Sequence, residues 1–125
     1  MSHISKIELE VKDLAVLSQA CARLGMEFIR GQNQFKWYGK DAPCDHVIKV
    51  PGADYEIGVV KEKHRYELNC DFYDRSIEKV IGRQAGLLKQ AYAVAKTKIE
   101  ARRKGYCVLE KNTETGVRLH IRINQ

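Results

Sequence analysis

Alternation of apolar and polar residues is the feature that most restricts how this chain folds. The alternation is clearest over residues 66–72, and a two-residue period is typical of a half-buried strand. The same period, or a short apolar run before a breaker, predicts further strands at residues 4–11, 26–30, 34–38, 46–50, 55–59, 106–110 and 117–123. We therefore expect much of the core to be built on a sheet.

Two segments show helical spacing instead. Residues 14–24 carry an apolar stripe, and Asp13 is placed to cap the helix that this stripe predicts. A long helix is predicted over residues 77–103. Because glycine is a poor helix former, Gly82 and Gly86 predict a bend or break in its first half.

These elements predict one α+β domain spanning residues 1–125, with an antiparallel or mixed sheet of about six or seven strands and two helices packed on one face. Residues 34–38 are expected to pair with residues 26–30 as a hairpin, and residues 39–45 to form a loop. The sheet face without helices must be solvated or covered by a partner. We expect this face to carry Tyr38, Tyr73 and His120, and it is where function is sought.

Positive charge is concentrated on the long predicted helix. The formal net charge of the chain is +6, and residues 75–104 alone carry nine basic and two acidic residues. Lys89, Lys96 and Arg103 are the candidates for an anion-binding face that would take nucleic acid, nucleotide phosphate or an acidic protein. The alternative is a solvated helix exterior that also complements the helix dipole.

A second basic cluster lies on the last predicted strand. Arg118, His120 and Arg122 alternate with apolar residues, so their side chains share one face and could grip a phosphate or carboxylate. The alternative is cross-strand pairing with acidic residues that also alternate outward, namely Glu8, Glu10, Glu67 and Asp71.

Candidates for ligand stacking and for catalysis are fewer. Tyr38 is expected to point outward beside Lys36, where it could stack on a ligand, while Trp37 is expected to point inward. Cys44 and His46 share a strand face, which would suit a thiolate–imidazole pair, but nothing in the sequence orients the imidazole.

No metal, cofactor or enzymatic activity is expected. A zinc site drawn from Cys44, His46, His64 and Cys70 matches no standard ligand spacing. The sequence contains no phosphate-binding loop, dinucleotide fingerprint, nucleophile elbow or zinc-protease motif. Four scattered cysteines, with neither a signal peptide nor a membrane-spanning run, predict buried thiols and a cytoplasmic location.

Several segments together resemble a known family. They are the opening Met1–Ser5, the strand Tyr66–Asp71, the helix segment Gln90–Ala93, and the closing segments around Gly105-Tyr106 and Gly116–Leu119. They are similar to the Ycf family numbered thirty-five, which comprises hypothetical chloroplast reading frames with relatives in bacteria and tailed phages. The middle of the chain, including Lys36–Gly39 and Cys44–His46, resembles the phage and bacterial branch. The resemblance implies a small intracellular α+β domain and no established activity.

The sequence therefore leaves several functions open. The first is a non-enzymatic binding or adaptor protein, from a phage or bacterium, that binds a host or partner component. The second is a binder of nucleotides or other small anions in a homo-oligomer, with Tyr38, Arg118, His120 and Arg122 as contacts. The third is nucleic-acid binding through the basic helix, and the fourth is an enzyme centred on Cys44 or His46. A homodimer or larger symmetric assembly is also expected, because strand 117–123 would be hazardous as an open sheet edge.

Overall fold

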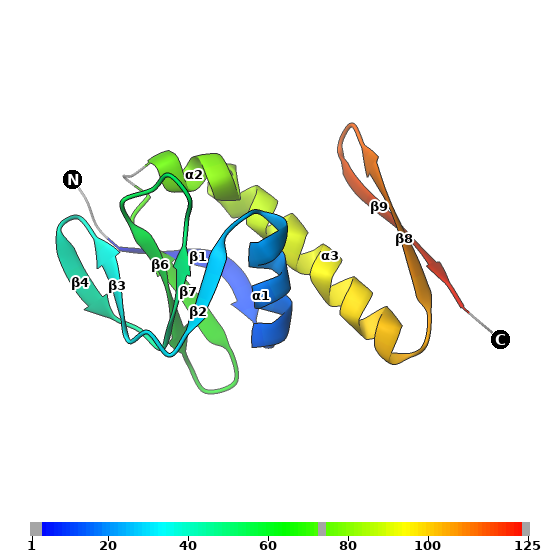
Figure 1. The fold of residues 1–125 in the computed structure, drawn as a ribbon, viewed down its shortest axis with the longest axis horizontal. Coiled ribbons are helices and arrows are strands. Elements are labelled where there is room, and N and C mark those ends of the chain that lie inside the picture. The colour runs from blue at the N-terminus through cyan, green and yellow to red at the C-terminus, as the bar shows by residue number, and fades with distance from the viewer. Residues whose placement is uncertain (1–3, 73–74, 124–125) are drawn as a thin grey trace.

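The chain has an α+β architecture in the computed structural model, which describes residues 4–72 and 75–123 (Figure 1). This confirms the predicted fold class. The strands are β1 (Ser5–Val11), β2 (Glu27–Arg30), β3 (Gln34–Trp37), β4 (Lys40–Pro43), β5 (His46–Lys49), β6 (Glu56–Lys61), β7 (Tyr66–Cys70), β8 (Cys107–Thr113) and β9 (Gly116–Arg122). The helices are α1 (Leu14–Arg23), α2 (Arg75–Ile81) and α3 (Gly86–Arg103), with a short 3-10 turn at Arg83–Ala85.

The strands divide among three sheets, where the sequence predicts one. A five-stranded antiparallel sheet has the order β1-β7-β6-β5-β2, while β3–β4 and β8–β9 form separate two-stranded ribbons. Alternation marks which residues form strands but does not specify their partners. Tyr73 of the predicted open face lies outside the described residues.

The main core lies between the helices and one face of the five-stranded sheet. Ile57 and Val59 of β6 point into it, and α1 packs against α3 beside it. Its largest fully buried side chains include Ile7, Leu17, Ile48, Leu68, Ile77 and Leu88. Cys21 and Cys70 are buried there as predicted, and burial raises the pKa of each thiol to about 12. The prediction of buried thiols fails for the other two cysteines, because Cys44 is half-buried and Cys107 is exposed.

The other face of the sheet is partly covered by the β3–β4 ribbon, where we expected solvent or a partner. Phe35 of β3 is only 1% exposed and lies directly over Gly58 of β6. A β-carbon at Gly58 would lie 2.3 Å from Phe35 Cδ1, so no larger residue fits there. The buried Glu56 carboxylate accepts a hydrogen bond from the Lys36 backbone N–H at 2.9 Å, which ties β3 to the sheet.

The pairing of β3 differs from the predicted hairpin. β2 pairs with β5, and β3 pairs with β4, which falls within the predicted loop. Tyr38 and Gly39 connect β3 to β4 with φ angles of 41° and 68°, the two positive values that a type I′ turn requires. The sequence Lys40–Pro43 lacks the apolar alternation that would have marked it as a strand.

The predicted break in the long helix is confirmed. Gly82, with a φ of 85°, ends α2, and α3 begins at Gly86 after the 3-10 turn. The positive φ angles of Gln84 and Ala85 complete the change of direction. α3 is therefore a separate helix.

α3 is covered on two sides. Leu88, Ala91, Tyr92 and Ala95 belong to the main core. A second stripe at i+4 and i+3 spacing carries the β8–β9 ribbon and consists of Gln90, Val94, Lys98 and Ala101. Figure 1 shows the ribbon on the side of α3 away from the five-stranded sheet. The basic residues of α3 consequently do not form one continuous solvated face.

Candidate functional site

The register of the β8–β9 ribbon places four basic residues on one face. Lys111 is paired with Arg118, Leu109 with His120, and Cys107 with Arg122. Residues that are directly opposite each other share a face, and alternate positions along a strand do as well. We call Lys111, Arg118, His120 and Arg122 the basic hairpin face. The alternation of β9 predicted three of them, whereas Lys111 lies beyond the predicted end of its strand.

The basic hairpin face does not meet the acidic residues suggested as its cross-strand partners. β9 pairs only with β8, whereas Glu8, Glu10 and Glu67 belong to the five-stranded sheet and Asp71 directly follows it. Glu67 instead pairs with Lys6 Nζ at 3.1 Å and lies 3.9 Å from Arg65 Nη2. Among the described residues, no ion pair involves the basic hairpin face. Its charge is therefore directed to solvent.

The opposite face of the ribbon is anchored to the helices by Glu110. Arg23 at the end of α1 donates two hydrogen bonds to the Glu110 carboxylate, at 2.8 and 2.6 Å, and Lys98 Nζ lies 2.6 Å from the same carboxylate. The hydrogen bonds from Arg23 and then from Lys98 lower the pKa of Glu110 to about 2. This clamp fixes which face of the ribbon points outward.

Tyr38 does not lie near the other predicted ligand contacts. It is 56% exposed in the β3–β4 turn, and Figure 1 shows that ribbon at the opposite end of the molecule from β8 and β9. The grouping of Tyr38 with Arg118, His120 and Arg122 is therefore wrong as a single site. Near Tyr38, a separate hollow of about 360 Å³ is lined by Trp37, Lys40 and Tyr55 among others.

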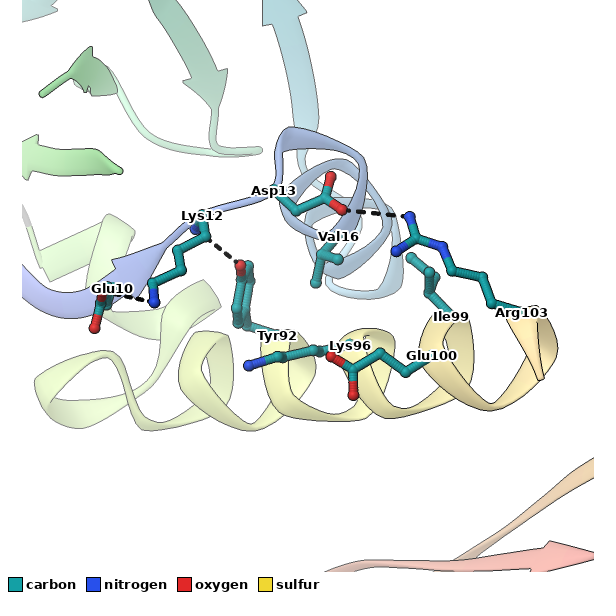
Figure 2. Close-up of a pocket in the computed structure, with 9 residues that line it drawn as sticks. All are labelled: Glu10, Lys12, Asp13, Val16, Tyr92, Lys96, Ile99, Glu100 and Arg103. Carbon is teal, nitrogen blue, oxygen red and sulfur yellow. Dashed lines mark hydrogen bonds and ion pairs between the residues drawn. The ribbon is translucent and has the colours of Figure 1, made fainter. Parts of the chain in front are cut away.

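A pocket between α3 and the β1–α1 connection gathers two of the predicted helix cations (Figure 2). Its volume is about 350 Å³, and Lys96 and Arg103 line it together with Lys12. Lys89 lies seven residues before Lys96 and fourteen before Arg103, so it shares their face of the helix, but it does not line the pocket. The contribution of Lys12 was missed because it depends on how α1 packs against α3.

Both cations and carboxylates line this pocket, and the ion pairs between them are long. Lys12 lies 3.6 Å from Glu10, and Arg103 lies 3.6 Å from Asp13, which also caps α1 by accepting from the Ala15 N–H. These separations exceed the 2.6 Å contacts of Glu110, so the cations are freer to turn toward a ligand. The Tyr92 hydroxyl accepts a hydrogen bond from the Lys12 N–H at 3.3 Å and closes the inner wall.

The geometry at Cys44 and His46 does not support a reactive pair. The Cys44 thiol donates to the Gln32 carbonyl at 3.3 Å, and burial with the nearby Asp45 charge raises its pKa to about 11. His46 Nδ1 accepts from the Gly31 N–H at 3.0 Å, and its ring lies between Phe28 and Tyr66.

The four residues considered for zinc do not form a metal site. Over residues 4–72 and 75–123, no group of three His, Cys, Asp or Glu side chains is arranged to hold a metal ion. The same residues include no helix that is both long and apolar enough to cross a membrane.

Comparison with known proteins places the chain in a family. Residues 20–120, which include the last turn of α1 and all of the later elements to near the end of β9, match the DUF1257 family of proteins of unknown function. The chain belongs to the DUF1257 family. No curated protein and no solved structure matches it. The expectation of an uncharacterised family is thus confirmed. The matched region contains Lys111, Arg118 and His120 of the basic hairpin face and the α3 side of the pocket, but neither Arg122 nor Lys12.

Proposed function

We propose that this DUF1257 protein is a non-enzymatic binding protein that docks an anionic partner protein on the basic hairpin face. The observation that supports this most strongly is the charge of that face. It holds three formal positive charges and His120, and none of its described residues is a carboxylate or forms an ion pair. Unpaired surface charge of one sign steers partners of the opposite sign and selects against others.

The exposed apolar side chains of the ribbon add to this proposal. Leu109, paired with His120 between the basic residues, is 58% exposed, and Ile121 on the other face is 49% exposed. Apolar side chains between charged ones are typical of a protein interface, in which charge orients the partner and apolar contact adds affinity. Resemblance to the phage and bacterial branch suggests that the partner is a host component and that binding takes place in the cytoplasm.

Charge reversal on the hairpin tests the proposal. We expect tagged wild-type protein to retain a cell-extract component at low salt, and the double variant Arg118→Glu/Arg122→Glu to retain at least tenfold less of it, because two attractive contacts become repulsive. Quantitative pull-down measures the difference. The matched control, Lys63→Glu/Lys79→Glu, changes net charge equally at two exposed sites away from β8–β9. Equal loss in both variants would indicate non-specific attraction and count against the basic hairpin face.

A second candidate function is the binding of a nucleotide or other small anion, and it has its own supporting observation. Lys96 and Arg103, predicted as anion contacts, line the pocket of Figure 2 together with Lys12. The carboxylates that pair with Lys12 and Arg103 are 3.6 Å away, and Glu100 also lines the pocket. A phosphate or carboxylate could displace these contacts, while the Tyr92 ring and Ile99 offer apolar wall. In a homo-oligomer, a neighbouring subunit would close the open side.

Thermal unfolding with added nucleotides measures this second candidate. A ligand present at about 100 times its Kd should stabilise the protein by about 2.7 kcal/mol, which would appear as a raised Tm. We expect Lys96→Gln to abolish the shift. Lys79→Gln, an exposed α2 substitution outside the pocket, should leave the shift unchanged. No shift with any mono-, di- or cyclic nucleotide would remove nucleotides from consideration.

Nucleic-acid binding through α3 ranks third. The basic residues of the helix are distributed over different surroundings, because Lys98 pairs with Glu110 while Lys96 and Arg103 face the pocket. A continuous row of free cations, which would give strong and salt-dependent phosphate binding, is not formed by these three residues.

A further inference from the structure

We infer that the free edge of β9 takes up an extended peptide of alternating acidic and apolar residues as a third strand of the β8–β9 ribbon. This inference rests on the proposed binding function and specifies the class of partner and its mode of binding.

The first observation is the open edge itself. β9 pairs with β8 from Gly116 to Arg122, and no other strand of the described chain adjoins it. The strand contains no proline, so its outward backbone N–H and C=O groups can continue a ladder. Peptides that add a strand to such an edge obtain affinity from main-chain hydrogen bonds and specificity from alternate side chains.

The second observation is the chemistry of the two faces. An added strand would set its own side chains beside Arg118, His120 and Arg122 on one face, at about 4.5–5.5 Å between β-carbons. Acidic residues at every second position would therefore form cross-strand ion pairs. On the other face, the intervening residues would lie beside Leu119 and Ile121, and Ile123 just beyond the strand is 60% exposed. Apolar residues suit those intervening positions.

A second copy of the chain is a poor occupant of this edge. When two identical strands pair about a two-fold axis, residues of the same face meet. Arg118 would then face Arg122 of the second copy, with His120 facing itself, and other registers that overlap these residues also oppose basic side chains. Like charges directly opposite are destabilising, so the edge selects against self-pairing although β9 is open. The expected homodimer, if it forms, needs another surface.

A nucleic acid is also less suitable than a peptide. Proteins that bind single strands usually stack bases on aromatic side chains, and residues 107–122 contain no Phe, Tyr or Trp. An extended peptide uses the backbone edge, which a phosphodiester chain cannot pair with. The edge and the side chains therefore favour the same kind of ligand.

Fluorescence anisotropy with defined peptides tests the inference. The probe is a labelled heptapeptide of alternating glutamate and valine, and its control has the same composition with glutamates and valines in two blocks. We expect the alternating peptide to bind at least tenfold more tightly, because only it matches both faces. Arg118→Glu/Arg122→Glu should abolish binding, and its far-ultraviolet circular dichroism should match the wild type. Lys63→Glu/Lys79→Glu should bind normally.

N-methylation of the peptide separates strand addition from simple charge attraction. In a strand, successive backbone N–H groups point to opposite edges. Methylation of the glutamate nitrogens and methylation of the valine nitrogens should therefore have unequal effects, one abolishing binding and the other sparing it. Equal binding of both methylated peptides, or of the block peptide, would overturn the added strand while leaving the proposed binding function standing.

Two further outcomes would contradict the inference. Tighter binding of a single-stranded oligonucleotide than of the alternating peptide would favour nucleic acid as the ligand. Light scattering that shows a dimer of wild-type protein, converted to monomer by Arg118→Glu/Arg122→Glu, would assign the edge to a second copy. Failure of the proposed function itself would show separately, as equal extract retention by wild type and double variant.

Discussion

Replacement of Phe35 by alanine is expected to lower the free energy of unfolding by about 3–5 kcal/mol. The ring is almost fully buried between the β3–β4 ribbon and the sheet, and it fills the space left by the missing side chain of Gly58. Removing it leaves a cavity that the backbone of β6 cannot close. The hydrogen bond from the Lys36 N–H to Glu56 would remain as one attachment of the ribbon. Urea denaturation followed by circular dichroism measures the change.

Tyr38→Ala is the matched control in the same ribbon. Tyr38 is also aromatic but is more than half exposed in the turn, so its replacement should change stability by no more than about 0.5 kcal/mol. If Phe35→Ala were as mild as Tyr38→Ala, Phe35 would not hold the ribbon against the sheet, and the second face of the sheet would be open as the sequence predicts.

Replacement of Glu110 by alanine is expected to weaken the docking of the β8–β9 ribbon on the helices by about 1.5–3 kcal/mol. The carboxylate accepts both hydrogen bonds of Arg23 and contacts Lys98, so its loss leaves two cations close together without their shared partner. The ribbon has few other contacts with the body beyond α3. Thermal unfolding, with limited proteolysis of the ribbon, measures the effect.

The same clamp predicts the pH dependence of docking. Pairing lowers the pKa of Glu110 from its ordinary value of about 4.3 to about 2 in the folded state. Its contribution is therefore complete above the ordinary value and is lost as the pH falls toward about 2. Glu114→Ala, in the exposed tip of the same ribbon, should change neither stability nor its acid dependence. Identical acid profiles of wild type and Glu110→Ala would show that the clamp does not stabilise docking.

The sequence could predict the elements better than their partners. Alternation located most strands, and Gly82 located the end of α2, because both depend on local preferences. It could not predict that Phe35 would pack over Gly58 or that β4 would form, because those contacts join segments whose own patterns are weak. Tyr38 and Gly39 form the type I′ turn that leads into β4, but this pair is a weak sequence signal because such turns prefer Asn or Asp before the glycine.

The candidate sites divide in the same way. The shared face of Arg118, His120 and Arg122 follows from the two-residue period and is present in β9. Neither Lys12 in the pocket nor Arg23 at Glu110 could be foreseen, since Arg23 and Glu110 are separated by 87 positions and meet only through tertiary packing. The sequence correctly locates an excess of basic residues on α3. Which of them line the pocket and which contact Glu110 depends on the fold.

Because α3 is buried on two sides, it joins two parts of the molecule that differ in local stability. The β8–β9 ribbon can separate from α3 without breaking any pairing of the five-stranded sheet, because β8 and β9 form a sheet of their own. Local openings of this kind cost less free energy than global unfolding. The surface that carries the basic residues can therefore fluctuate without disturbing the five-stranded sheet. A ligand that contacted both β9 and α3 would hold the ribbon against the helix and suppress its local opening.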